Sequence, residues 1–111
     1  MEASKYKRRV CAAVASYHIN IPAEFRDKLC LRSGDKVSIK TIKDRIYVSK
    51  NSHPQKGSQD LASIVHAVGR HMRSLRFTIP IGIVALYHLE TRPMLDVCLE
   101  DDSIIYDLGS S

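Results

Sequence analysis

Few residues in this 111-residue chain have the types and the spacing that chemistry at a catalytic or metal site requires. His66, His71 and Cys98 carry side chains that bind metals, but their spacing matches no familiar metal site. The sequence contains no Gly-x-Ser-x-Gly motif, no glycine-rich phosphate loop and no His-x-x-x-His pair. We therefore predict that the protein is not an enzyme and has no catalytic residue, bound metal or cofactor.

The strongest chemical signal is the distribution of charge along the chain. Residues 1–50 carry 12 Lys and Arg against 5 Asp and Glu, a net charge of +7, whereas residues 51–111 carry 5 against 7, a net charge of −2. Cationic side chains bind phosphates and release the counterions around them. A basic half joined to a mildly acidic half therefore predicts a polyanionic partner for the first half and a different role for the second.

Nine basic residues are the candidate DNA contacts: Lys5, Lys7, Arg8, Arg9, His18, Arg26, Lys28, Arg73 and Arg76. Four of them lie close together near the N-terminus, and two are expected on the exposed side of a short helix. Two alternatives stay open for these side chains. They could be ordinary solvated charges, or Arg26 could form an ion pair with Glu24 or Asp27 on its own helix.

Hydrophobic patterns predict the elements that would position these charges. Residues 10–16 form a short apolar run that favours a strand, and residues 18–21 alternate polar and apolar side chains as a half-buried strand does. Pro22 suits the first turn of a helix, because its φ is close to the helical value and it has no N–H to leave unpaired. A short helix, a glycine turn and a β-hairpin are expected next, at residues 23–31, at Gly34 and over residues 37–48.

The sequence repeats itself with a shift of 58 residues. Without a gap, Arg-Phe-Thr-Ile-Pro at residues 76–80 falls on His-Ile-Asn-Ile-Pro at residues 18–22, and the apolar pattern then matches to the end of both copies. The second helix, expected over residues 81–89, is apolar on every face where the first is charged. Because an exposed apolar face is unfavourable in water, we predict that Ile81, Val84 and Leu86 form an oligomer or partner interface.

These observations divide the chain into a basic N-terminal arm at residues 1–9, a first repeat at 10–50, a polar linker at 51–60 and a second repeat at 61–108. The sequence has no run of about 18 apolar residues and no signal peptide with an apolar core. We therefore expect a cytoplasmic protein with no membrane partner. Its three cysteines lie far apart in the sequence, and we expect them to be reduced.

The first repeat resembles the swapped-hairpin DNA-binding domain of the AbrB/MazE family, also called SpoVT-AbrB. The resemblance lies in Ile-Pro-Ala-Glu-Phe-Arg-Asp-Lys-Leu at residues 21–29, Ser-Gly-Asp at 33–35 and Val-Ser-Ile at 37–39. It covers residues 18–49 well and the second copy only in outline. It implies a mainly β fold with short helices, in which two tandem ββαββ units interleave their hairpins into a small pseudo-twofold β-barrel. Members of the family are DNA-binding regulators or antitoxins.

Charge and resemblance together predict a regulator of transcription that binds double-stranded DNA, either sequence-specifically or as an architectural protein. The second repeat would hold a homodimer or a larger self-assembly together. Two other classes of protein stay open. An antitoxin would bind a toxin through the apolar second repeat, and a barrel-shaped adaptor would have no affinity for DNA.

Overall fold

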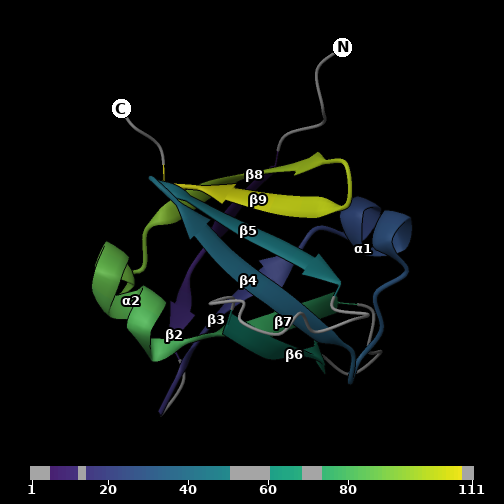
Figure 1. Ribbon diagram of the computed structural model, residues 1–111. Helices are drawn as coiled ribbons and strands as arrows, with labels where there is room; N and C mark the ends of the chain where they lie inside the picture. The colour runs from purple at the N-terminus through teal and green to yellow at the C-terminus, as the bar shows by residue number, and fades with distance from the viewer. Residues whose placement is uncertain (1–5, 13–14, 51–60, 69–73, 109–111) are drawn as a thin grey trace.

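The protein is built from one nearly closed, barrel-like antiparallel sheet, with two short helices at opposite sides of the view in Figure 1. The computed structural model describes residues 6–12, 15–50, 61–68 and 74–108. The first half contains β1 (Tyr6–Arg9), β2 (Cys11–Ala12), β3 (Tyr17–Ile21), α1 (Ala23–Leu29), β4 (Lys36–Ile42) and β5 (Arg45–Lys50). The second half contains β6 (Leu61–Val68), β7 (Ser74–Ile79), α2 (Ile81–Tyr87), the 3-10 turn η1 (Leu89–Thr91), β8 (Met94–Glu100) and β9 (Ser103–Asp107). The prediction of a mainly β fold with short helices is confirmed.

The two helices begin and end in the same way. Each follows a proline with φ of −56°, and each ends at a residue in the left-handed conformation, Cys30 with φ of 55° and His88 with φ of 56°. The left-handed residue stops the helix, and this is why α2 is shorter than residues 81–89, the span we expected. Phe25 of α1 and Ile83 of α2 are buried, so each helix packs one side against the barrel.

The two hairpins also match each other. The turn between β4 and β5 has Lys43 with φ of 54°, and the turn between β8 and β9 has Asp101 with the same φ. These two residues are 58 positions apart, the shift of the sequence repeat. Gly34 has φ of 96°, the left-handed conformation expected of the glycine turn.

Strand pairing joins the halves at equivalent positions. The strand order is β1-β8-β9-β5-β4-β6-β7-β3-β2. In the β3·β7 pair Ile19 lies opposite Phe77, and in the β5·β9 pair Tyr47 lies opposite Ile105; both pairs are 58 residues apart. The first strand of each half pairs with the hairpin of the other half, β1 with β8 and β6 with β4.

The N-terminal strand differs from the prediction. We expected a basic arm over residues 1–9 and a strand over 10–16, but residues 6–9 already form the strand β1, and residues 11–12 form β2. The cause is a period-two alternation in which Tyr6 and Arg8 are half-buried while Lys7 and Arg9 are exposed. The Tyr6 ring packs edge-on against Phe25 at 5.2 Å between ring centroids. Residues 1–5 and the predicted linker at 51–60 lie outside the described residues.

Two buried valines show that the two copies differ in the spacing between their first two strands. Val10 and Val65 are both fully buried, and each donates its backbone N–H to the neighbouring segment, Val10 to Pro93 O at 3.1 Å and Val65 to Asp35 O at 2.8 Å. Pro93 and Asp35 are 58 residues apart, but Val10 and Val65 are 55 apart. The second copy therefore has three more residues between its first two strands than the first copy has.

Candidate nucleic-acid interface

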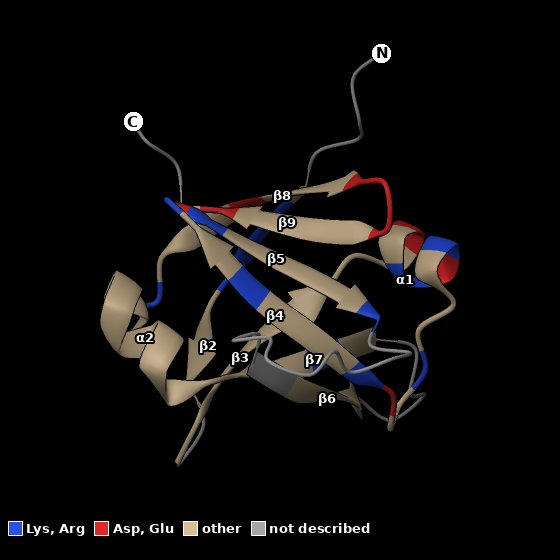
Figure 2. Ribbon diagram, viewed as in Figure 1, with Lys and Arg blue, Asp and Glu red and all other residues tan. Residues whose placement is uncertain are grey.

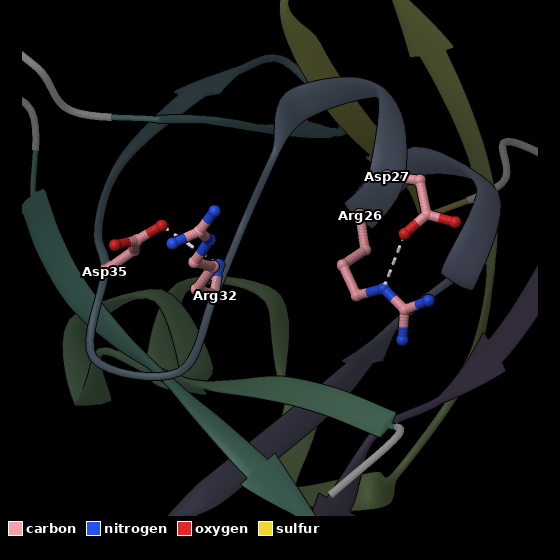
Figure 3. A network of polar contacts seen from close by, with 4 residues as sticks. All are labelled: Arg26, Asp27, Arg32 and Asp35. Atoms are coloured by element: carbon pink, nitrogen blue, oxygen red, sulfur yellow. Dashed lines mark hydrogen bonds and ion pairs between the residues drawn. The ribbon is translucent and has the colours of Figure 1, made fainter.

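The two predicted DNA contacts on α1 are held in ion pairs. Arg26 Nε lies 3.0 Å from Asp27 Oδ1 (Figure 3), and Lys28 Nζ lies 3.6 Å from Glu24 Oε2. The Tyr6 hydroxyl donates a hydrogen bond to Glu24 at 2.5 Å, and this bond raises the pKa of Tyr6. The second alternative left open by the sequence, pairing of Arg26 on its own helix, is therefore the arrangement present. The charges of α1 are largely balanced within the helix, which makes it a weak phosphate-binding surface.

His18, predicted to touch DNA, is buried instead, with 8% of its surface exposed. Its Nε2 lies 2.8 Å from Ser16 Oγ, and its Nδ1 lies 3.3 Å from Thr78 Oγ1. Burial lowers the pKa of His18, and the positive charges of Arg76 and His66 lower it further. A buried imidazole favours its neutral form, and both ring nitrogens of His18 are already engaged, so the structure gives no support to a phosphate contact by this residue.

Arg76 occupies the position equivalent to His18 and is only half-buried. It lies opposite Asn20 on one neighbouring strand and opposite His66 on the other. Its Nε is buried without a hydrogen-bond partner, and no carboxylate of the described residues forms an ion pair with it. Arg76 therefore keeps a net positive charge on the face formed by β3 and β7.

The cations of β1 point in two directions. Lys7 and Arg9 are exposed, and Arg9 Nη1 donates to Arg92 O at 3.1 Å. Arg8 is half-buried and lies over the Tyr6 ring, 5.4 Å from its centroid. Among residues 6–9, the described part of the predicted arm, Lys7 and Arg9 are therefore the exposed cations. Lys5 and Arg73, the two remaining candidates, lie outside the described residues.

A row of lysines on β4 was not among the predicted contacts. Lys36 and Lys40 are exposed and alternate with the buried Val37 and Ile39, so they share the outer face of the strand. Figure 2 shows Lys and Arg positions in blue along β4. Lys43 follows in the turn and is also exposed. We call Lys36, Lys40 and Lys43 the basic wing. The period-two spacing of the first two was visible in the sequence and could have identified them.

The basic wing differs from the neighbouring cations Lys50 and Arg45 in forming no ion pair within the described residues. None of its three lysines forms an ion pair with a residue in the described part of the chain. By contrast, Lys50 Nζ lies 3.7 Å from Asp35 Oδ2, and Arg45 Nε lies 3.4 Å from Asp107 Oδ2. The three exposed lysines of the basic wing lie on one strand and its turn and are therefore available to an anionic partner.

Two of the three residues of the predicted interface on α2 are exposed. Ile81 is 74% exposed and Leu86 is 61% exposed, whereas Val84 is only 3% exposed and packs in the core. Gly82 and Ala85 lie on the exposed side with them, and the helix carries no charged residue. Val84 cannot contact a partner without unfolding the helix from the barrel, so the candidate docking surface consists of the exposed side alone.

Comparisons of the chain with protein-family models, with curated proteins and with solved structures found no match. Within the described ranges, no group of three or more His, Cys, Asp or Glu side chains is arranged to hold a metal ion. No helix in that part of the chain is long and apolar enough to cross a membrane. The site is therefore interpreted from its geometry and charge.

Proposed function

We propose that this protein is a regulator of transcription that binds double-stranded DNA. Among the described residues, the basic wing would supply most of the phosphate contacts. The observation that carries the proposal is the row of exposed, unpaired lysines on β4 and its turn. The rise of a strand places Lys36 and Lys40 roughly 13 Å apart. This separation is close to the width of the DNA major groove, about 12 Å, so the two ammonium groups can reach phosphates on both of its sides.

We infer further that the chain is a tandem, single-chain version of a swapped-hairpin dimer. Two features of the strand pairing support this inference. Residues 58 apart pair directly in β3·β7 and in β5·β9, as they would across a twofold axis. The first strand of each half also pairs with the hairpin of the other half, so the halves are interleaved.

The proposal is tested by comparing two sets of lysine and arginine substitutions. The triple variant Lys36→Ala, Lys40→Ala and Lys43→Ala removes the basic wing, and the double variant Arg26→Ala and Lys28→Ala removes paired charges of α1 instead. Fluorescence anisotropy with a labelled duplex at low salt measures the DNA affinity of both variants. We expect the triple variant to lose at least tenfold in affinity and the double variant to lose less than threefold. Equal affinity of the triple variant and the wild type would contradict the proposal.

A second candidate function is docking of a protein on α2. It is favoured by the high exposure of Ile81 and Leu86 on a helix without charge. An exposed apolar face of this kind is typical of an interaction site. The partner in this proposal is a second copy of the chain, which would make the protein a homodimer or larger assembly. A toxin protein is the alternative occupant, and it would make the protein an antitoxin.

A further inference from the structure

The outer face of the sheet formed by β4, β5, β9 and β8 carries its positive and negative charges on opposite sides. The basic wing lies on β4 and its turn, where the exposed Asp44 follows Lys43. The turn between β8 and β9 carries the exposed residues Glu100, Asp101 and Asp102, which we call the acidic wing (Figure 2). The two turns are equivalent in the repeat, because Lys43 and Asp101 are 58 residues apart and have the same φ. One scaffold position has thus received opposite charges in the two halves.

The charges of both wings are unpaired in the described part of the chain. No residue of either wing forms an ion pair there. Neighbouring charges do pair, since Arg45 and Asp107 form an ion pair across the β5·β9 junction between the wings. Charged side chains on this face can therefore form ion pairs, but the six charged side chains of the two wings are exposed to solvent.

Apolar side chains lie between the wings. Ile105 is 1% exposed, yet it lies outside the core cluster of the barrel. It lies opposite the half-buried Tyr47 in the β5·β9 pair. Ile42, at the basic end of the face, is 44% exposed. Two shallow hollows adjoin the Arg45–Asp107 ion pair, one lined in part by Lys43 and the other in part by Glu100.

We propose that this sheet face binds a second copy of the chain, with the acidic wing of each copy lying against the basic wing of the other. A twofold dimer uses the same surface on both copies, so a face with opposite charges on its two sides is complementary to itself. Each contact between wings is then made twice. Electrostatic complementarity of this kind selects the partner and its orientation.

The proposal does not depend on DNA binding, but it predicts how the two would interact. The acidic wing of a second copy occupies the same lysines that would bind phosphates. Self-association through this face and DNA binding through the basic wing therefore exclude each other. DNA would therefore dissociate this dimer, which is distinct from any assembly formed through α2.

Two charge-reversal variants test the proposal. In one, Lys36, Lys40 and Lys43 are changed to Glu, so that both wings are acidic. In the other, Glu100, Asp101 and Asp102 are changed to Lys, so that both wings are basic. Asp96 is left unchanged, because Lys7 lies opposite it on β1. Both variants are made in the Leu86→Glu background to remove association through α2, and circular dichroism checks that they fold.

Sedimentation velocity at about 50 mM and about 500 mM salt, where the Debye length differs severalfold, gives the readout. We expect the Leu86→Glu parent to dimerise at low salt and to dissociate at high salt. Each charge-reversal variant alone should associate at least tenfold more weakly, and an equimolar mixture of the two should regain a dimer. A parent that stays monomeric at low salt would overturn the proposal. So would variants that each dimerise as well as the parent. Anisotropy with labelled DNA on the parent reports the proposed DNA binding separately.

Discussion

Helices α1 and α2 occupy equivalent places in the two halves and differ in almost every outward residue. Both follow a proline, and both end at a left-handed residue. Phe25 and Ile83, which are equivalent, are both buried. At the outward positions, however, α1 has Lys28 where α2 has the exposed Leu86. The comparison teaches that the inward face of each helix was kept for packing while the outward face was free to change.

The charges of α1 remain predicted DNA contacts, and we expect them to contribute less than the basic wing does. They are paired with one another within the helix. Helix α2 has no such pairs and leaves two large apolar side chains in water. The two helices therefore differ in whether their exposed side is charged or apolar. Helix α1 presents charged side chains to solvent, whereas a protein partner is proposed to cover the exposed side of α2.

The largest effect is expected from exchanging one equivalent pair of residues, Arg26 and Val84. Val84→Arg would place a charge in the core, where Val84 is 3% exposed, and should lower the free energy of unfolding by roughly 3–5 kcal/mol. Arg26→Val removes a partly exposed ion pair and should change it by less than about 1 kcal/mol. Urea denaturation followed by circular dichroism measures both. Similar costs for the two variants would show that α2 is not packed as described.

The exposed side of α2 can be tested without disturbing the fold. Leu86→Glu should leave the free energy of unfolding of the monomer within about 0.5 kcal/mol of the wild type, because the side chain is 61% exposed. It should nevertheless lower any self-association that survives high salt by tenfold or more. Light scattering at 500 mM salt gives the molar mass. Lys28→Ala, at the equivalent position of α1, is the matched control and should leave the mass unchanged.

The left-handed residues that end the two helices predict a stabilising change. Cys30 and His88 pay the steric cost of a positive φ that glycine avoids. Cys30→Gly and His88→Gly should each raise the free energy of unfolding by about 1 kcal/mol, and the two gains should add. Thermal denaturation measures them. Destabilisation by either substitution would mean that the contacts of the replaced side chain stabilise the fold by more than its positive φ costs.

The strands before the helices extend the comparison, since His18 and Arg76 are equivalent. Burial and two nearby cationic groups lower the pKa of His18 in the folded protein. As the pH falls below the ordinary histidine pKa of about 6.5, the unfolded chain takes up a proton that the folded chain resists, so stability is lost on acidification and is fully present above that pH. His18→Gln should show a smaller loss between pH 7 and pH 5. Equal slopes in urea titrations at several pH values would refute this assignment.

The elements with a clear period were predictable from the sequence. The strand ending at Ile21, the proline-started helix and the first hairpin all lie where alternation and turn residues place them. The N-terminal strand was missed because Arg8 reads as polar, although it lies inward over Tyr6. Burial of Val84 could not be predicted, since a helix that is apolar on every side gives no phase to its pattern.

The candidate site was predicted less well than the fold, and the reason is long-range contact. His18 is buried against Thr78, 60 residues away in the sequence, and no local pattern reports such a pair. The sequence identified Arg26 and Lys28 as charged residues of the helix. It left an ion pair of Arg26 on its own helix open as an alternative but did not predict that both charges are paired. The lysines of β4 were visible as an alternating pattern, but only the structure shows that the neighbouring cations are paired and these are not.

The most direct test of the central claim is the salt dependence of DNA binding by the wild type and the basic-wing triple variant. Each phosphate contact contributes about 0.9 to the slope of log affinity against log salt concentration. The account predicts steep salt dependence for the wild type and a slope shallower by about 2.7 for the variant, because three contacts are lost. Undetectable binding, salt-independent binding, or equal slopes for the two proteins would contradict it.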